Sequence, residues 1–562
     1  MENGLFSAAK LMVQNKASSS IGYIVSASNW ARFAERLGIK CLGVFSILCY
    51  LIDQRCIFIG LLYSSNFYKT GSPVMHPFFS TLSVNKEIAR PVYLQLVEQL
   101  IEGIKLGGIP SLTRLPGTRQ LSAVLGIHRK TVVRAYDDLL AQGWLESKTG
   151  SGTFVAKHLP LISPKPIGND DAEAANPLQV AGFSFPQSHN LDREFIKPTA
   201  RFHLDDGFPD PRLAPLHELS RAYRTQLLMG NTYSRLGYED PQGSEWLRDE
   251  LAKHLKETRA MRVGKENILI TRGTIMGVYL SSAGLLSKGD CVVVGSLGWA
   301  SANVSFTHVG ARLLYIGCDE FGIKMDELEQ LCLTHKVRMV YVTPHHNYPT
   351  TVSLRADRRI QLLQLSVKYG FVIFEDDYDY DFHYLNKPLS PLASSDDAGM
   401  TLYCGSFTKT ISPAFRVGYL VGSANVIRHL AKLRRIVDRQ GDTMLDNAIA
   451  ELLQHGIIQR HLRKSVRIYR QRRDVFADLL RSELSKWVDF KLPEGGMSVW
   501  AEFDPSVNLQ VLAKKALQKD LFFSGGREFY LPDTEVNATR FGFASSTPEE
   551  LGQCVEILKS LL

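Results

Sequence analysis

Apolar residues recur every three or four positions in the segment that follows Pro91, at Tyr93, Leu96, Val97, Leu100 and Ile104. This spacing predicts an amphipathic helix, and Gly107 and Gly108 predict its end. A second helix is expected to begin at Gly117 or Thr118 and to carry the next apolar residues, Leu121, Val124 and Leu125. After Gly126, a third helix is expected to bury Val132, Tyr136, Leu139 and Leu140.

A short hairpin is predicted after these helices, with its tip at Gly150, Ser151 and Gly152. Three helices followed by a hairpin are typical of a winged helix-turn-helix domain over residues 75–158. In helix-turn-helix proteins the N-terminal residues of the recognition helix reach base edges in the major groove. Here those residues include Arg129 and Lys130, and Arg suits guanine. The alternative is a three-helix module with solvated basic residues.

From about residue 200, apolar strands alternate with longer helical stretches, which predicts an α/β fold with a parallel sheet over residues 200–562. Three of these strands end in polar clusters, at residues 343–349, 375–379 and 405–409. Open α/β sheets bind ligands at the carboxyl ends of their strands. The sequence therefore predicts a binding site at this edge.

Two further segments lack such periodicity. Residues 159–199 contain six prolines and several small polar residues, so we expect a semi-extended linker. Residues 1–74 include an apolar stretch at 41–63, but Asp53 and Arg55 split it into halves too short to cross a membrane. We interpret residues 1–74 as an upstream extension without a packed fold, with Met75 as an alternative start. The other interpretation is a membrane anchor.

Composition adds few constraints. A chain of 562 residues is long enough for about three to four domains, and a net charge of +8 suits a polyanionic partner. The eight cysteines form no CxxC pair and no metal-ligand spacing. We therefore expect reduced thiols, a cytoplasmic location and no metal site.

The polar clusters fit pyridoxal 5'-phosphate (PLP). Lys409 is the amine that would form a Schiff base with the cofactor aldehyde, and Asp376 would keep the pyridine nitrogen protonated. Tyr378 could donate to the ring hydroxyl, and Arg540 could hold an incoming carboxylate. The remaining cofactor-binding candidates are Gly273 and Thr274 at a helix N-terminus, Trp299 for stacking, Asn347, and the phosphate ligands Ser406, Thr408 and Arg416.

Each of these residues alone has an ordinary explanation, because a single lysine is usually solvated and an acidic run is usually a surface turn. Together they resemble fold-type I aminotransferases, and residues 75–562 resemble the MocR subfamily of GntR-type regulators. In that subfamily a winged helix-turn-helix is joined to an aminotransferase-like domain. The motifs that carry the resemblance are residues 238–243, 375–379 and 406–419.

The resemblance implies a homodimer that binds double-stranded DNA and PLP. The DNA contacts that it implies lie at the second and third helices and at the wing, namely Arg119, His128, Arg129, Lys130, Thr131, Gly150 and Gly152. Some positions depart from the family pattern. Ile275 and Met276 replace two glutamines, Thr351 replaces a glycine, Trp299 replaces a tyrosine, and Tyr348 stands where aminotransferases often have asparagine, with Asn347 one position earlier. These changes concern the substrate side more than the cofactor side.

Three functions remain open at this point. We favour a PLP-dependent transcription regulator that senses PLP or an amino compound; the alternatives are an active aminotransferase with a DNA-binding appendage and a DNA-binding scaffold with an inactive pocket. A basic band from Arg428 to Arg439 and from Arg460 to Arg473 is either a solvated helix surface or a second DNA-contacting surface. The effector, the operator and the direction of regulation do not follow from the sequence.

Overall fold

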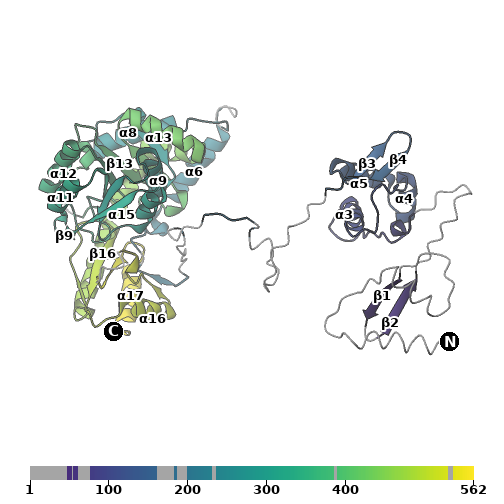
Figure 1. Cartoon of the computed structure of the whole chain (residues 1–562). Coiled ribbons are helices and arrows are strands. Elements are labelled where there is room, and N and C mark those ends of the chain that lie inside the picture. Colours follow the sequence, from purple (N-terminus) through teal and green to yellow (C-terminus); the bar gives the residue numbers. More distant parts are fainter. Residues whose placement is uncertain are drawn as a thin grey trace, which may run out of the picture. The chain divides into compact units, whose positions relative to one another are not determined.

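The computed structural model describes residues 76–160, 199–204, 206–230, 236–384, 389–529 and 536–562, two strands before residue 61 and a few positions between 181 and 191. The chain divides into an N-terminal unit, Met1–Val180, and a C-terminal unit, Ala181–Leu562 (Figure 1). The predicted linker at 159–199 lies almost entirely outside the described residues. Its proposed role as a tether stays a prediction.

Three α-helices and a hairpin pack together within residues 92–155 of the N-terminal unit (Figure 1). The helices are α3 (Val92–Lys105), α4 (Thr118–Leu125) and α5 (Arg129–Ala141), and strands β3 (Leu145–Lys148) and β4 (Gly152–Val155) pair antiparallel. A shared core buries Leu96, Leu121 and Leu139 completely. Most of the predicted apolar positions are buried in this core or pack against it, whereas Val124 is exposed.

Backbone geometry explains the sharp turn between α4 and α5. Gly126 ends α4 in the left-handed region at φ 61°, a conformation that glycine adopts without a steric cost. His128 then caps α5, because its side chain accepts a hydrogen bond from the backbone N–H of Lys130. The Tyr136 hydroxyl donates to the carbonyl of Pro116 at 2.9 Å and so ties α5 to the segment before α4.

Two strands pair within residues 1–74, the segment in which we expected no packed fold. Strand β1 (Ile47–Ile52) pairs antiparallel with β2 (Arg55–Gly60), and the register joins Ile47 to Gly60 and Ile52 to Arg55. Within the described part of the chain, no helix has the length and apolar character that a membrane crossing requires.

A seven-stranded sheet organises the C-terminal unit. Its order is β6 (Ile268–Thr271), β14 (Gly418–Val421), β13 (Thr401–Ser406), β12 (Val372–Asp377), β11 (Val337–Val342), β7 (Cys291–Gly295) and β8 (Arg312–Ile316). All neighbouring pairs from β13 to β8 are parallel, whereas β14 runs antiparallel to both β13 and β6. This mostly parallel sheet confirms the predicted α/β fold.

Helices cover the sheet in separate apolar clusters. Side chains from α9 (Gly273–Leu285), α10 (Ala300–His308) and α13 (Ala424–Val437) form one cluster with the sheet. Helices α11 (Met325–Thr334) and α12 (Ala356–Tyr369) form a second. The third and largest includes side chains of α6 (Leu216–Leu228), α8 (Glu245–Arg259), α14 (Thr443–Gln454) and α15 (Ile457–Glu483).

The C-terminal part of this unit adds smaller sheets. Strands β15 (Val488–Phe490), β16 (Ser498–Phe503) and β18 (Ala538–Gly542) form an antiparallel sheet with α16 (Leu509–Gln518) and α17 (Pro548–Lys559) nearby (Figure 1). Strand β5 (Phe202–His203) pairs with β17 (Leu521–Phe522), and β9 (Cys318–Asp319) pairs with β10 (Gly322–Ile323). The β5–β17 pairing joins the start of the unit to its C-terminal part.

The basic band does not form a continuous exposed surface. Arg434 on α13 is fully buried, and Arg472 and Arg473 on α15 are nearly so. Arg434 donates to the carbonyls of Ile270 and Pro241, and Arg472 forms an ion pair with Asp210. These arginines hold the domain together and are unavailable to DNA.

We predict that Arg434→Ala lowers the free energy of unfolding of the C-terminal unit by about 3–5 kcal/mol, because it leaves buried acceptors without their donor. The exposed neighbour provides a control, since Arg435→Ala should change it by less than about 0.5 kcal/mol. Urea denaturation followed by circular dichroism measures both. Equal stability of the two variants would contradict the structural role of Arg434.

Candidate functional site

The carboxyl ends of β11, β12 and β13 lie at one edge of the sheet and border a cavity of about 200 Å³. Nine of the predicted residues line this cavity: Thr274, Trp299, Asp376, Tyr378, Ser406, Thr408, Lys409, Arg416 and Arg540. Gly273 and Asn347 do not. The lining also includes residues that were not singled out as ligands, namely Asp206, Phe208, Ile275, Tyr341, Thr343 and Tyr348.

Asp376 is a buried carboxylate with one oxygen committed to the protein. The Tyr341 hydroxyl donates to its Oδ2 at 2.7 Å, whereas its Oδ1 has no hydrogen-bond partner among the described residues. Burial, together with the charges of Asp377 and Asp379, raises the pKa of Asp376 to about 7, although the hydrogen bond from Tyr341 lowers it. The unpaired oxygen at a cavity wall therefore suits a positively charged donor from a ligand.

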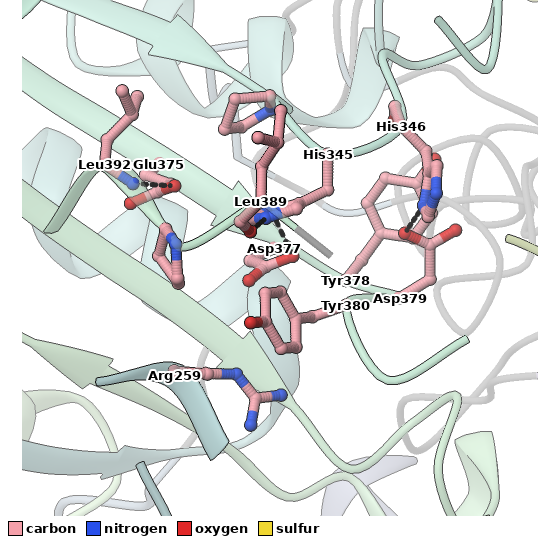
Figure 2. A network of polar contacts seen from close by, with 12 residues as sticks. Arg259, His345, His346, Glu375, Asp377, Tyr378, Asp379, Tyr380, Leu389 and Leu392 are labelled. Carbon is pink, nitrogen blue, oxygen red and sulfur yellow. Dashed lines mark hydrogen bonds and ion pairs between the residues drawn. The ribbon is translucent and has the colours of Figure 1, made fainter. Parts of the chain in front are cut away.

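The acidic run around Asp376 is not a surface turn. Glu375, Asp376 and Asp377 belong to strand β12 and are buried, as is Asp379 just beyond it. Figure 2 shows the surroundings of Glu375, Asp377 and Asp379, each of which has a different partner. Glu375 accepts from the backbone N–H groups of Leu392 and Ala393 at 2.8 and 2.9 Å.

Two histidines from the loop after β11 pair with the other carboxylates (Figure 2). His345 lies 3.2 Å from Asp377, and the His346 Nδ1 lies 2.7 Å from Asp379. Burial alone would raise the pKa of Asp377, but the charge of His345 and the hydrogen bonds from His345 and Tyr403 hold it at about 2. Both histidines belong to the polar cluster at residues 343–349, for which we predicted no pairing with the acidic run.

Lys409 follows β13 and reaches the segment that precedes α6. Its Nζ donates to the carbonyl of Gly207 at 2.7 Å and to that of Asp206 at 3.3 Å. It also lies 5.0 Å from the centre of the Phe208 ring. The ammonium group is thus held at the cavity wall by backbone carbonyls.

The opposite part of the lining carries hydroxyl and guanidinium groups beside a helix N-terminus. The Ser406 hydroxyl donates to Thr408 Oγ1 at 2.8 Å, and Arg416 donates to the carbonyl of Arg272 at 3.1 Å. Gly273, the first residue of α9, has φ 73°, and a Cβ there would lie 2.8 Å from the Arg416 guanidinium. Gly273 therefore acts through its lack of a side chain, which lets Arg416 approach α9.

Arg540 on β18 is almost completely buried at the cavity. Its Nη2 donates to the Tyr378 hydroxyl at 3.2 Å, and its Nη1 donates to the carbonyl of Pro349 at 3.1 Å. Asn347 instead uses its amide to donate to Thr350 at 3.0 Å, which keeps that amide within its own loop. Tyr348, the next residue, takes the place at the cavity that we predicted for Asn347.

In the N-terminal unit the predicted DNA-contacting residues are accessible. Arg119, His128, Arg129, Lys130, Gly150 and Gly152 are exposed, and Thr131 is half-buried. Arg129 donates to the Thr118 hydroxyl at 3.3 Å, which brings the start of α5 and the start of α4 together. Arg134, on the same helix, packs with its guanidinium carbon 4.0 Å from the centre of the Tyr93 ring on α3.

Comparison with known proteins agrees with this arrangement. The class I and II aminotransferase family matches residues 210–558, and the bacterial regulatory proteins of the gntR family match residues 92–155. The probable rhizopine catabolism regulatory protein MocR of Rhizobium meliloti is 28% identical over 493 residues, which cover 85% of this chain and 95% of that protein. The uncharacterized HTH-type transcriptional regulator YisV of Bacillus subtilis is 28% identical over 465 residues, covering 82% and 94%.

The C-terminal unit is similar to solved aminotransferases. The α-aminoadipate aminotransferase LysN of Thermus thermophilus, complexed with N-(5'-phosphopyridoxyl)-L-leucine, superposes with a TM-score of 0.60 at 26% identity, covering 64% of this chain and 92% of that one. Fold and site together thus define an aminotransferase-like domain joined to a winged helix-turn-helix. The chain belongs to the class I and II aminotransferase family, carries a gntR-family domain, and is similar over most of its length to the regulatory protein MocR.

The raised pKa of Asp376 predicts a pH-dependent stability of the cofactor-free protein. An Asp whose pKa rises to about 7 on folding stabilises the fold fully below its unfolded pKa, and this contribution is lost as the pH rises through about 7. Asp376→Asn should therefore increase the free energy of unfolding at pH 8 by roughly 1–3 kcal/mol. Its effect should shrink toward pH 4.

Asp377→Asn is the matched control. In the wild type the pKa of Asp377 is held at about 2, so the charged Asp377 stabilises the fold at pH values above its unfolded pKa. Loss of this carboxylate in Asp377→Asn should therefore destabilise the protein at pH 8. Urea denaturation at several pH values measures both variants. Destabilisation by both at pH 8 would show that the pKa of Asp376 is not raised.

Proposed function

We propose that this protein is a transcription regulator that binds double-stranded DNA through its winged helix-turn-helix and senses PLP, or an amino compound at PLP, in its aminotransferase-like domain. The observation that carries the proposal is the buried Asp376, which lines the same cavity as Lys409 and whose Oδ1 has no hydrogen-bond partner among the described residues. Since its proposed DNA target lies in the cytoplasm, we propose that location as well.

The residues present fit the cofactor. Asp376 Oδ1 can accept from a protonated ring nitrogen, and Ser406, Thr408 and Arg416 with the N-terminus of α9 would hold the phosphate. Trp299 at the cavity wall would cover the ring. When bound, PLP supplies an aldehyde that condenses with amines and a ring that withdraws electrons. The adduct in the related Thermus thermophilus structure supports this assignment.

The chain's own groups then set the protonation of the site. Lys409 provides the amine that would hold the cofactor. Burial raises the pKa of Tyr378 well above its ordinary value, although Arg540 lowers it, so its hydroxyl stays protonated and donates to the carbonyl of His346. A positively charged donor at Oδ1 of Asp376, which has no hydrogen-bond partner among the described residues, would favour the charged form of this carboxyl group.

Exposed apolar residues near the cavity support a homodimer. In the C-terminal unit, Tyr238 is 81% exposed and Ile436 is 83% exposed, and Ile275 both lines the cavity and is partly exposed. An ion pair between Arg272 and Asp438 at 2.9 Å brings the start of α9 close to the end of α13. A second copy that covers these residues would bury them and close the cavity.

Turnover as an aminotransferase is the alternative. Lys409, Asp376 and Arg540 line the cavity and would permit it. We favour sensing because the relatives that span both units are named as regulators, and because Arg540 already has acceptors within the protein. A ligand at this site can shift DNA binding only as far as it binds the two states of the protein differently.

Lys409→Ala should abolish the visible absorption band that PLP develops when it is held by a lysine. The reason is that no other lysine lines the cavity among the described residues. Absorption spectra of the wild type and the variant, mixed with equal amounts of PLP, make the comparison. Lys514→Ala, at an exposed lysine on α16, is the control and should retain the band. An unchanged band in Lys409→Ala would contradict the assignment.

Arg129→Ala should abolish specific DNA binding and leave the absorption spectrum with PLP unchanged, since a lost base contact costs about 1–3 kcal/mol. Arg134→Ala on the same helix is the control. Its guanidinium packs on Tyr93, so we expect a smaller loss of affinity. Gel-shift titrations with genomic DNA from beside the gene measure both variants. Wild-type affinity in Arg129→Ala would refute its role in DNA recognition.

A further inference from the structure

Arg540, which we expected to hold the carboxylate of a ligand, already forms an ion pair with a carboxylate of the protein, that of Asp206. The Oδ1 of Asp206 lies 2.6 Å from the Nε of Arg540. The other oxygen, Oδ2, accepts from the Tyr348 hydroxyl at 2.6 Å. Both oxygens of Asp206 thus have partners at the cavity wall.

The other two nitrogens of Arg540 also face protein oxygens. Nη1 donates to the carbonyl of Pro349 and Nη2 to the hydroxyl of Tyr378. Arg540 is 2% exposed, whereas Asp206 is 35% exposed and borders the cavity. A buried guanidinium needs a counter-charge, and Asp206 supplies it before any ligand arrives.

Asp206 is also fixed from the side of Lys409. The Lys409 Nζ donates to the backbone carbonyls of Asp206 and Gly207. Asp206 therefore contacts both the lysine that would hold the cofactor and Arg540. An amine that enters beside Lys409 meets the carboxylate of Asp206, not a guanidinium without a partner.

We propose that Asp206 is a specificity-determining residue, a built-in occupant of the carboxylate position, and that the amine recognised here carries no carboxylate beside its amino group. This proposal rests on the proposed function and names its ligand class, amines and amino alcohols in place of amino acids. A ligand carboxylate would have to displace Asp206 from Arg540 or lie against it, and like charges in a partly buried site repel.

Ethanolamine and L-serine test the proposal because they differ only by the carboxylate. Their dissociation constants for the PLP-loaded protein are measured by isothermal titration calorimetry. We expect the wild type to bind ethanolamine at least about tenfold more tightly, since like-charge repulsion exceeds one tenfold step in affinity. Equal or tighter binding of L-serine to the wild type would overturn the proposal.

Asp206→Asn removes the charge and keeps the side chain's size. In this variant the guanidinium of Arg540 lacks its counter-charge, so the preference should shift toward L-serine by about tenfold or more. Asp397→Asn, at an exposed aspartate outside the cavity lining, is the matched control and should keep the wild-type preference. If Asp206→Asn folds and still prefers ethanolamine to L-serine as the wild type does, the proposal is overturned. If the variant does not fold, the affinities of the wild type for the two ligands test the proposal alone.

A cofactor-free arm separates this proposal from the proposed function. Propionate is the probe, and saturation-transfer NMR measures its binding to protein that contains no PLP. We expect Asp206→Asn to bind propionate and the wild type to show no binding. If no visible band develops with PLP, the proposed function fails while this arm still tests Asp206. Equal binding of propionate by wild type and variant would count against Asp206 as an occupant of the carboxylate position.

Discussion

The site depends on the burial of four carboxylates within five residues at the end of one strand. Glu375, Asp376, Asp377 and Asp379 are almost completely removed from solvent, and a buried charge without a partner is costly. Backbone N–H groups satisfy Glu375, while His345 and His346 pair with Asp377 and Asp379. These pairings fix the strand end and leave one oxygen of Asp376 for a ligand.

This arrangement explains why the same residues serve stability and binding. Burial raises the pKa of Asp376 to about 7 in the cofactor-free protein, and a positive donor beside its unpaired oxygen would favour the charged form. The cost of its burial is thus offset by ligand binding. Arg540 illustrates the opposite case, since Asp206 already neutralises it. We infer that the cavity is prepared for a cation at Asp376 and closed to an anion at Arg540.

The spacing of apolar residues and the position of polar clusters after apolar runs were sufficient to predict the two folded domains and the edge of the sheet where the cavity lies. Asp376 and Lys409 each lie in a polar cluster that comes after an apolar run in the sequence, and parallel neighbours must place their carboxyl ends together. The apolar spacing predicted the helices of the N-terminal unit, and Gly126 predicted the turn between α4 and α5, where it adopts a left-handed conformation. The family comparison confirms the fold that these patterns indicated.

Other features depend on contacts between distant segments, which the sequence does not reveal. Asp206 precedes the predicted sheet and meets Arg540 only through the tertiary fold. Arg434, Arg472 and Arg473 follow helical spacing but are buried against acceptors, because spacing cannot distinguish an exposed basic face from one that is neutralised inside. Asn347 and Tyr348 are adjacent, and only the path of their loop decides which reaches the cavity.

We propose that the two units form one regulatory circuit, so that a ligand at Lys409 changes the affinity for DNA. The DNA dissociation constant of the wild type and of Lys409→Ala, each with and without PLP and a saturating amine, tests this coupling. We expect a shift of about 5-fold or more for the wild type and none for Lys409→Ala. An equal affinity of the wild type under all conditions would contradict it.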